Sequence, residues 1–139
     1  MSLKQNIYLA GTIYNDSIHA NWKNIFNDSI DKEFFSTFDP APDMEPKSFD
    51  TVARDKQIID RSQIIVAYIA KITVGTTMEI FYAHTNGKIV YIIDATEDNR
   101  LQNDLWLSAH CHRFFNHQNI DSVVTDCAHY INEYMKKYI

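Results

Sequence analysis

The chain has 139 residues, which suits one domain with a substantial core and leaves little room for a second. Its 18 acidic side chains outnumber 13 Lys and Arg, for a formal net charge of -5. This balance argues against nucleic-acid polymers and anionic membranes as partners, because both attract a positive surface. Two cysteines give no disulfide framework, and the first residues carry no signal-peptide pattern. We therefore expect one cytoplasmic domain, residues 1–139, that takes a small neutral ligand.

Short, almost continuously apolar runs predict strands that are buried on both faces, as in a parallel sheet. The longest of them is too short to cross a membrane. Segments with helical character lie between the runs, and this alternation predicts a doubly wound, Rossmann-like α/β fold: a parallel sheet of about five strands with helices on both faces. The expected strands are 7–11, 34–39, 64–70 and 89–94, the expected helices are 17–31, 49–62, 76–87 and 120–137, and residues 105–115 have room for a short helix and a fifth strand.

All three prolines lie in one segment, "FDPAPDMEP", directly after the second expected strand. We expect this segment to form a long loop over the carboxyl edge of the sheet, where open α/β folds bind ligands. The loops after the first and third strands should meet it there. Three segments could therefore build a site together: "AGTIYND", "FDPAPDMEP" and "KITVGTTME".

Glu79 is the first side chain that could carry chemistry. The run Thr76-Thr77-Met78-Glu79 matches a capping box, in which a glutamate at the third helical position bonds back to the cap residue. A carboxylate near the positive end of a helix should also have a lowered pKa and stay ionised. An ionised carboxylate at a pocket mouth is what a nucleophile toward an anomeric carbon must be, so cap and catalyst are compatible roles.

Asp55 is the second candidate. It falls on one helical stripe with Ile58, Ile59 and Ser62, so an acid interrupts a row that should face the core. Either the helix is rotated and Asp55 points to solvent, or it is partly buried and desolvation raises its pKa into the range of a general acid. Asp60 could orient it or be exposed.

Tyr8 lies in the first strand and fits either of two roles. It could fill the core, as most strand tyrosines do, or donate a hydrogen bond to a catalytic carboxylate at the sheet edge. Trp22 and Trp106 could likewise pack or stack on a flat ring.

Other chemistries lack their patterns. His110 and His112 would project to one side of a strand, but their spacing matches no zinc motif, so no metal is expected. "AGTIYND" has neither the lysine of a phosphate loop nor the glycines of a dinucleotide fingerprint, and no hydrolase elbow occurs.

Three blocks carry a family resemblance: "IYLAG" at 7–11, "DKQIIDRSQIIVAYI" at 55–69 and "VGTTMEIFYAHTNGKIVYII" at 74–93. In this order they resemble the nucleoside 2-deoxyribosyltransferase family, which includes hydrolytic nucleotide N-glycosidases. The resemblance implies a flavodoxin-like sheet and homo-oligomers in which a neighbouring subunit helps complete each active site. We expect no cofactor.

The resemblance also implies roles for individual residues. Glu79 would be the nucleophile, Asp55 would protonate or orient the base, and Tyr8 would position Glu79. By position, the sugar and base would be surrounded by Gly11, Thr12, Gly75, Thr76 and Met78. The contact that a neighbouring subunit makes to the 5′-hydroxyl would come from the region of Asn103 and Trp106.

Two positions depart from the family pattern. Thr73 stands where members often carry an aspartate, and Gln63 replaces the aspartate that commonly follows Ser62. The arginine and paired glycines of the monophosphate hydrolases are absent from "AGTIYND", which favours substrates with a free 5′-hydroxyl.

The expected function is thus a nucleoside 2-deoxyribosyltransferase that moves 2-deoxyribose between a deoxynucleoside and a free nucleobase through a covalent intermediate on Glu79. One alternative is an N-glycosidase that passes the sugar to water. The other is a non-catalytic nucleoside or nucleotide sensor in which Glu79 serves as a cap.

Overall fold

The computed structural model describes residues 3–12, 14–40, 49–116 and 119–136. Five strands form one parallel sheet in the order β2-β1-β3-β4-β5. The strands are β1 (Gln5–Ala10), β2 (Phe35–Phe38), β3 (Ile64–Ile69), β4 (Ile89–Asp94) and β5 (Arg113–Asn116). The α-helices are α1 (Trp22–Ser29), α2 (Phe49–Asp60), α3 (Val74–Thr85), α4 (Leu105–Ala109) and α5 (Ile120–Tyr134), and Leu101–Asn103 form the 3-10 helix η2.

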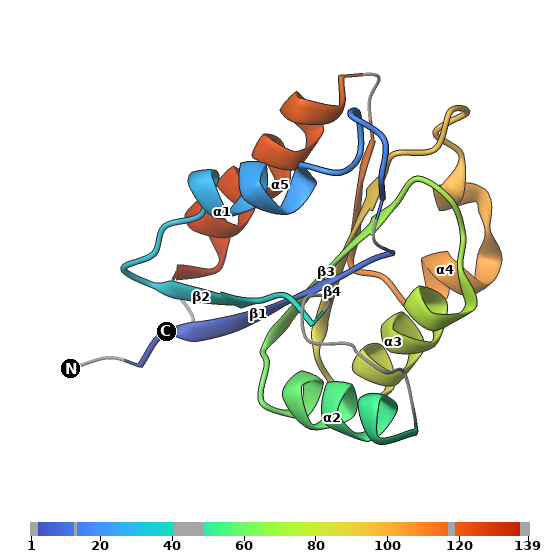
Figure 1. The fold of residues 1–139 in the computed structure, drawn as a ribbon. Coiled ribbons are helices and arrows are strands. Elements are labelled where there is room, and N and C mark those ends of the chain that lie inside the picture. Colours follow the sequence, from blue (N-terminus) through green and yellow to red (C-terminus); the bar gives the residue numbers. More distant parts are fainter. Residues whose placement is uncertain (1–2, 13, 41–48, 117–118, 137–139) are drawn as a thin grey trace.

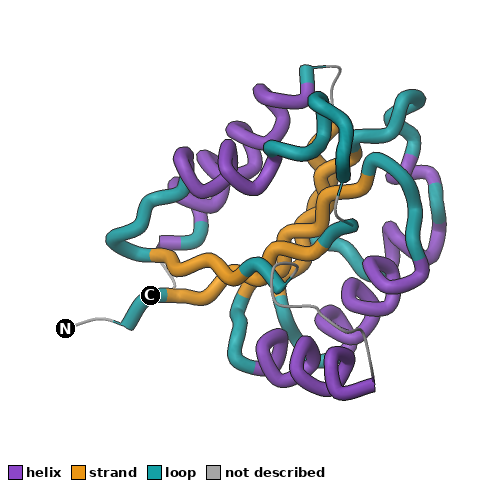
Figure 2. Tube along the Cα trace, viewed as in Figure 1, coloured by secondary structure: helices purple, strands orange, loops and turns teal. Residues whose placement is uncertain are grey.

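Helices cover both faces of the sheet. Figure 1 shows α1 and α5 on one side and α2, α3 and α4 on the other, and Figure 2 shows the same layers by type of element. Successive residues of a strand point to opposite faces, so β3 supplies Tyr68 to the core under α1 and α5 and Ile69 to the core under α2, α3 and α4. Every residue of β3 is buried, which is why its sequence is continuously apolar. The doubly wound fold predicted from the sequence is confirmed.

Two helices begin elsewhere than the sequence pattern predicted. Helix α1 begins at Trp22 rather than at residue 17, because the Asp16 carboxylate accepts the backbone N–H groups of Ile18 and His19 and holds the preceding residues in a turn. Helix α3 begins at Val74, two residues earlier than expected, with Thr73 as its extended N-cap residue. Gly75 therefore lies in the first turn, where its low helix propensity costs only about 1 kcal/mol.

The short helix and the fifth strand expected within 105–115 are present as α4 and β5. The fourth long helix, expected at 120–137, is α5 and ends at Tyr134. Most of the expected proline-rich loop, residues 41–48, lies outside the described residues. Across the part of the chain that the structure describes, each helix is too short or too polar to span a bilayer.

The register of the sheet brings three loops to one edge. Tyr8 pairs with Phe38 on one side and with Ile65 on the other. All strands run in parallel, so the residues after β1, β2 and β3 leave the sheet at the same, carboxyl edge. The edge is therefore where the described parts of the three predicted site segments meet.

Candidate active site

Tyr8 and Glu79 form the centre of the candidate site. Tyr8 is fully buried in β1, and its hydroxyl donates a hydrogen bond to Oε2 of Glu79 on α3. Its ring also stacks on Phe38, with 6.2 Å between ring centroids. Burial and the nearby Glu79 carboxylate raise the pKa of Tyr8, so the hydroxyl keeps its proton and acts as a donor. The interpretation of Tyr8 as core filling is confirmed, and its hydroxyl also bonds to a carboxylate, as the alternative expected; the catalytic role of that carboxylate stays a prediction.

Glu79 does not cap its helix. It is the sixth residue of α3, counted from Val74, and lies beyond the first turn in which a glutamate can reach the N-cap residue. The side chain of the cap residue, Thr73, is hydrogen-bonded to Thr76 through their hydroxyls, at 3.1 Å. The capping-box prediction is therefore wrong, because the N-cap residue is Thr73, three residues before the Thr76 that the pattern suggested.

The pKa of Glu79 is raised from 4.5 to about 7, chiefly by burial. The hydrogen bond from Tyr8 lowers this pKa, Asp55 raises it, and Lys23 lowers it. The sequence-based expectation of a lowered pKa is wrong, because Glu79 lies too far along α3 for the positive helix end to offset the loss of water. Near neutral pH the Glu79 carboxyl group is thus present in both its protonated and its ionised form.

Asp55 on α2 raises the pKa of both Tyr8 and Glu79. It projects from α2, its side chain is 15% exposed, and its Oδ1 lies 3.2 Å from Nη2 of Arg54. The same Arg54 nitrogen donates to the Pro40 carbonyl at 3.0 Å, which ties α2 to the end of β2. Burial raises the pKa of Asp55 although Arg54 opposes the shift. The partly buried alternative for Asp55 is confirmed, and the solvent-facing alternative is wrong.

Asp60 does not orient Asp55. It is exposed at the end of α2, and its carboxylate accepts a hydrogen bond from the Tyr82 hydroxyl at 2.7 Å.

A chain of threonine hydroxyls links the first loop to the start of α3. The Thr12 hydroxyl donates to that of Thr73 at 3.1 Å, and Thr73 donates in turn to the buried Thr76. Gly11 precedes this chain with a φ of +152°, and a Cβ there would meet the Tyr68 carbonyl at 3.0 Å. Glycine is therefore needed at position 11, because a side chain would both strain the backbone and crowd β3.

The other residues that the resemblance suggested lie on the outer surface. Gly75 and Met78 are exposed on α3, Asn103 is exposed at the end of η2, and Trp106 is 75% exposed on α4. The Trp106 ring is parallel to that of His110, at 6.0 Å between centroids. Trp22, by contrast, is buried against Tyr68, so it packs the core.

Sequence reasoning missed Lys23 and Asp39. Their side chains form an ion pair at the carboxyl edge, between α1 and the residue after β2. Asp39 ends the run "FFSTFD", so its place after a strand was a signal that it could reach the site. No sequence signal pointed to Lys23, because the pattern of a short helix does not show which strand end a long side chain approaches.

The histidines do not build a metal site in the described residues. His110 follows α4 and His112 precedes β5, so they do not share one side of a strand as predicted. His112 accepts the Val90 N–H at 3.0 Å through Nδ1. Among the residues that the structure describes, no three His, Cys, Asp or Glu side chains are grouped so that they could hold a metal ion.

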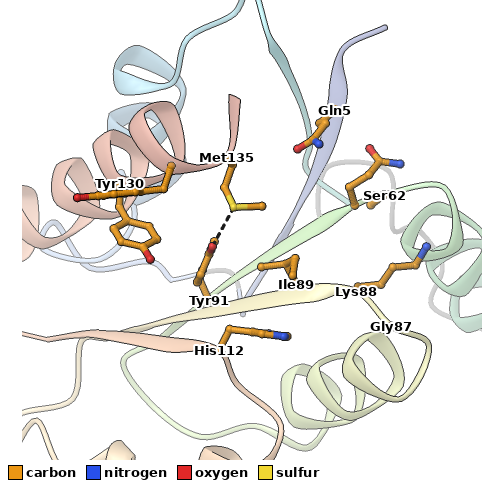
Figure 3. A pocket seen from close by; sticks show the side chains of 11 residues that line it. Gln5, Ser62, Gly87, Lys88, Ile89, Tyr91, His112, Tyr130 and Met135 are labelled. Atoms are coloured by element: carbon orange, nitrogen blue, oxygen red, sulfur yellow. Dashed lines mark hydrogen bonds between the residues drawn. The ribbon is translucent and has the colours of Figure 1, made fainter. Parts of the chain in front are cut away.

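A groove lies at the amino edge of the sheet, opposite to the candidate site. Figure 3 shows this groove of about 580 Å³, which lies between the starts of the strands and the end of α5. Its polar groups serve the fold: the Lys88 ammonium donates to the Asp60 carbonyl at 2.8 Å, and the Tyr91 hydroxyl donates to the Met135 sulfur at 3.3 Å. Nothing in these contacts points to chemistry.

Comparison with solved structures shows which proteins share this arrangement of strands. A 2-deoxyribosyltransferase from Bacillus psychrosaccharolyticus superposes with a TM-score of 0.65 and 20% identity, over 88% of this chain and 90% of that one. A 2-deoxyribosyltransferase from Leishmania mexicana gives a TM-score of 0.54 and 18% identity, over 65% of this chain and 64% of that one. The chain has the fold of 2-deoxyribosyltransferases.

The same fold occurs in proteins whose names carry no such activity. A conserved protein from Enterococcus faecalis gives a TM-score of 0.55 and 15% identity, over 99% of this chain and 100% of that one. No protein-family model matches the chain, and no curated protein matches it in sequence. The likeness to 2-deoxyribosyltransferases therefore establishes the fold, and any further argument must come from the site.

Proposed function

We propose that the protein is a nucleoside 2-deoxyribosyltransferase. The observation that carries the proposal is the partly buried Glu79 carboxyl group, which accepts a hydrogen bond from the Tyr8 hydroxyl at the carboxyl edge of a parallel sheet. A buried carboxyl group is costly to ionise, and side chains with perturbed pKa values cluster at functional sites. The likeness of the fold to 2-deoxyribosyltransferases and the order of the three sequence blocks support the same activity.

The proposed reaction is a double displacement. The Glu79 carboxylate attacks C1′ of the deoxynucleoside, the bond from C1′ to the base nitrogen breaks with its electron pair on the base, and Asp55 supplies the proton that the leaving base needs. A second base then attacks C1′ through a ring nitrogen, gives the proton of that nitrogen to the Asp55 carboxylate, and releases the Glu79 carboxylate. Two inversions give net retention and ping-pong kinetics. Burial raises the pKa of Asp55, and this favours the protonated form that a proton donor needs.

Incubation with a 2′-deoxynucleoside, with and without a free acceptor base, tests this function. Base exchange in the presence of acceptor, together with a deoxyribosyl adduct on Glu79 in the mass spectrum, is expected. Release of free deoxyribose at the same rate in both mixtures would identify the protein as an N-glycosidase. Binding without either product would identify a sensor, although a sensor in which Glu79 acts as a helix cap no longer fits, because Glu79 is not a cap.

A parallel assay with the 5′-monophosphate tests the expected preference for a free 5′-hydroxyl. The first loop contains one glycine and no arginine, so we expect the nucleoside to react faster than the monophosphate.

We further propose that two copies of the chain pair beside Glu79. Exposed apolar side chains on α3 and α4 support this, since they include Met78, one residue from Glu79, and Trp106, at 62% and 75% exposure. The complete set is Val74, Met78, Phe81, Leu105 and Trp106. Light scattering should give a dimer or larger assembly, and Trp106→Glu should convert it to a monomer, whereas Tyr134→Glu at the amino edge should not. A monomeric parent protein would refute the pairing.

A further inference from the structure

The connection between β3 and α3, residues 70–73, is bonded at its start to a side chain of the first loop. The Tyr14 hydroxyl accepts the backbone N–H group of Ala70 at 3.0 Å and that of Lys71 at 3.4 Å. Both N–H groups lie beyond the end of β3, outside the ladder of the sheet. A hydroxyl oxygen has two lone pairs, so a single tyrosine can accept two consecutive N–H groups.

The ring of Tyr14 is held in place by other aromatic rings. It packs against His19 and Tyr68, with centroids 5.5 and 5.8 Å away, and it adjoins the core under α1 and α5. The packed ring therefore presents its hydroxyl to the connection from a fixed position.

A second bond joins the same two loops at the other end of the connection. The Thr12 hydroxyl donates to that of Thr73 at 3.1 Å, and Thr73 is the N-cap residue of α3. From there the bonded hydroxyls continue to the buried Thr76, three residues before Glu79. The buried apolar residues of α3 lie in its later turns, and they are Ile80 and Ala83. Polar bonds to the first loop therefore hold the beginning of α3.

We propose that Tyr14 is a positioning residue whose hydroxyl fixes the β3–α3 connection against the first loop and so places the groups that hold the deoxynucleoside. The inference rests on the proposed function in one respect: Gly11, Thr12 and Thr76 are taken to surround the substrate. The Tyr14 hydroxyl bonds to backbone groups rather than to Glu79. Its removal should therefore weaken substrate binding and leave the chemical step in place.

Amide exchange at Ala70 tests the proposal without any substrate. Tyr14→Phe keeps the ring and removes the acceptor, so the Ala70 amide should exchange about three- to tenfold faster, as measured by NMR. Tyr14→Met also lacks the hydroxyl and is the second variant if the phenylalanine variant does not fold. Unchanged exchange at Ala70 in either folded variant overturns the proposal.

The matched control is Tyr82→Phe. Tyr82 is also partly buried, and its hydroxyl donates to the Asp60 carboxylate at 2.7 Å, between α3 and α2. Both substitutions remove one hydroxyl, so a general loss of stability would affect the two variants alike. Exchange at Ala70 should stay at the parent rate in Tyr82→Phe. Equally fast exchange in the control would indicate general loosening and would contradict the proposal.

Kinetics then separate positioning from a structural role. If base exchange occurs, Tyr14→Phe should raise KM for the deoxynucleoside about three- to tenfold and leave kcat within about twofold, because lost binding that is equal in ground state and transition state changes KM alone. A lower kcat at unchanged KM would mean that less of the protein is folded, and it would overturn the proposal. If the parent protein neither exchanges bases nor releases deoxyribose, the proposed function fails, whereas exchange at Ala70 still decides whether Tyr14 fixes the connection.

Discussion

The two edges of the sheet differ in the surroundings of their polar side chains. At the carboxyl edge, Tyr8, Asp55 and Glu79 are brought together from three elements, and burial raises the pKa of each. The amino edge has a groove of about 580 Å³, yet Lys88 and His112 there are bonded to backbone groups. One edge holds carboxyl groups whose ionised forms are destabilised by burial, and the other holds a groove whose Lys88 and His112 side chains are bonded within the fold.

This difference is why the proposed function rests on the carboxyl groups at one edge rather than on the groove at the other. A carboxyl group that loses water destabilises its own ionised form, so the folded chain gains nothing in stability from keeping Glu79 at neutral pH. A hydrogen bond to a backbone carbonyl, such as that of Lys88, stabilises the fold and needs no other explanation. The following experiments test this difference between the carboxyl edge and the amino edge.

Glu79→Gln should produce the largest change in activity. The neutral amide cannot form the deoxyribosyl ester, so the rate of base exchange should fall at least about a thousandfold. The measurement is the initial rate of exchange at saturating acceptor base. Activity within tenfold of the parent would remove Glu79 from the mechanism.

The same Glu79→Gln substitution should stabilise the protein above neutral pH. The folded pKa of Glu79 is raised from 4.5 to about 7, so its favourable contribution is complete below pH 4.5 and is lost as the pH rises through 7. The variant should therefore match the parent near pH 4 and exceed its free energy of unfolding by up to about 3 kcal/mol at pH 8. Urea unfolding at both pH values measures this, and a less stable variant at pH 8 would contradict it.

Tyr8→Phe should reduce the exchange rate by about 10- to 100-fold, the effect of losing one hydrogen bond to a charged group. The pKa of Glu79 should rise further, because the Tyr8 hydrogen bond lowers it, and the acid limb of the pH profile should move upward. Tyr68→Phe is the matched control: Tyr68 is also fully buried in a strand, but its hydroxyl lies 2.6 Å from Nδ1 of His19. Equal losses in both variants would mean that Tyr8 acts through packing alone.

Lys88→Met should have the smallest effect. It removes one hydrogen bond at the amino edge, so the free energy of unfolding should fall by no more than about 1 kcal/mol and the exchange rate should not change. Thermal unfolding and the exchange assay measure both quantities. A large loss of activity would show that the amino-edge groove takes part in the reaction. It would contradict the proposal that the activity depends on the carboxyl edge alone.

The fold was largely predictable because its signals are local. Continuous apolar runs mark strands that are buried on both faces, and β3 has all six of its residues buried. Helix starts were less predictable: Asp16 holds a turn where helical character was expected, and Gly75 lies inside the first turn of α3. A turn and a first helical turn use similar residues, so the sequence pattern does not place the boundary.

The electrostatics of the site could not be predicted in the same way. The sequence pointed to Tyr8, Asp55 and Glu79, but it assigned Glu79 a lowered pKa, and burial reverses that direction. It also left Lys23 and Asp39 unnoticed, although they form an ion pair at the same edge. A pKa depends on water removed by neighbours distant in the chain, and no local pattern carries that information.

By itself, the sequence determined the doubly wound sheet and the edge at which its loops meet, because both follow from apolar spacing and from the order of strands and helices. The roles expected of Tyr8, Asp55 and Glu79 came from the family resemblance. Only the tertiary structure decided that the Tyr8 hydroxyl bonds to Glu79, that Asp55 is shielded from water, and that Lys23 reaches the edge from the opposite face. Each of those depends on elements that packing brings together across the sheet, and packing fixes both the distance between charges and the water left around them.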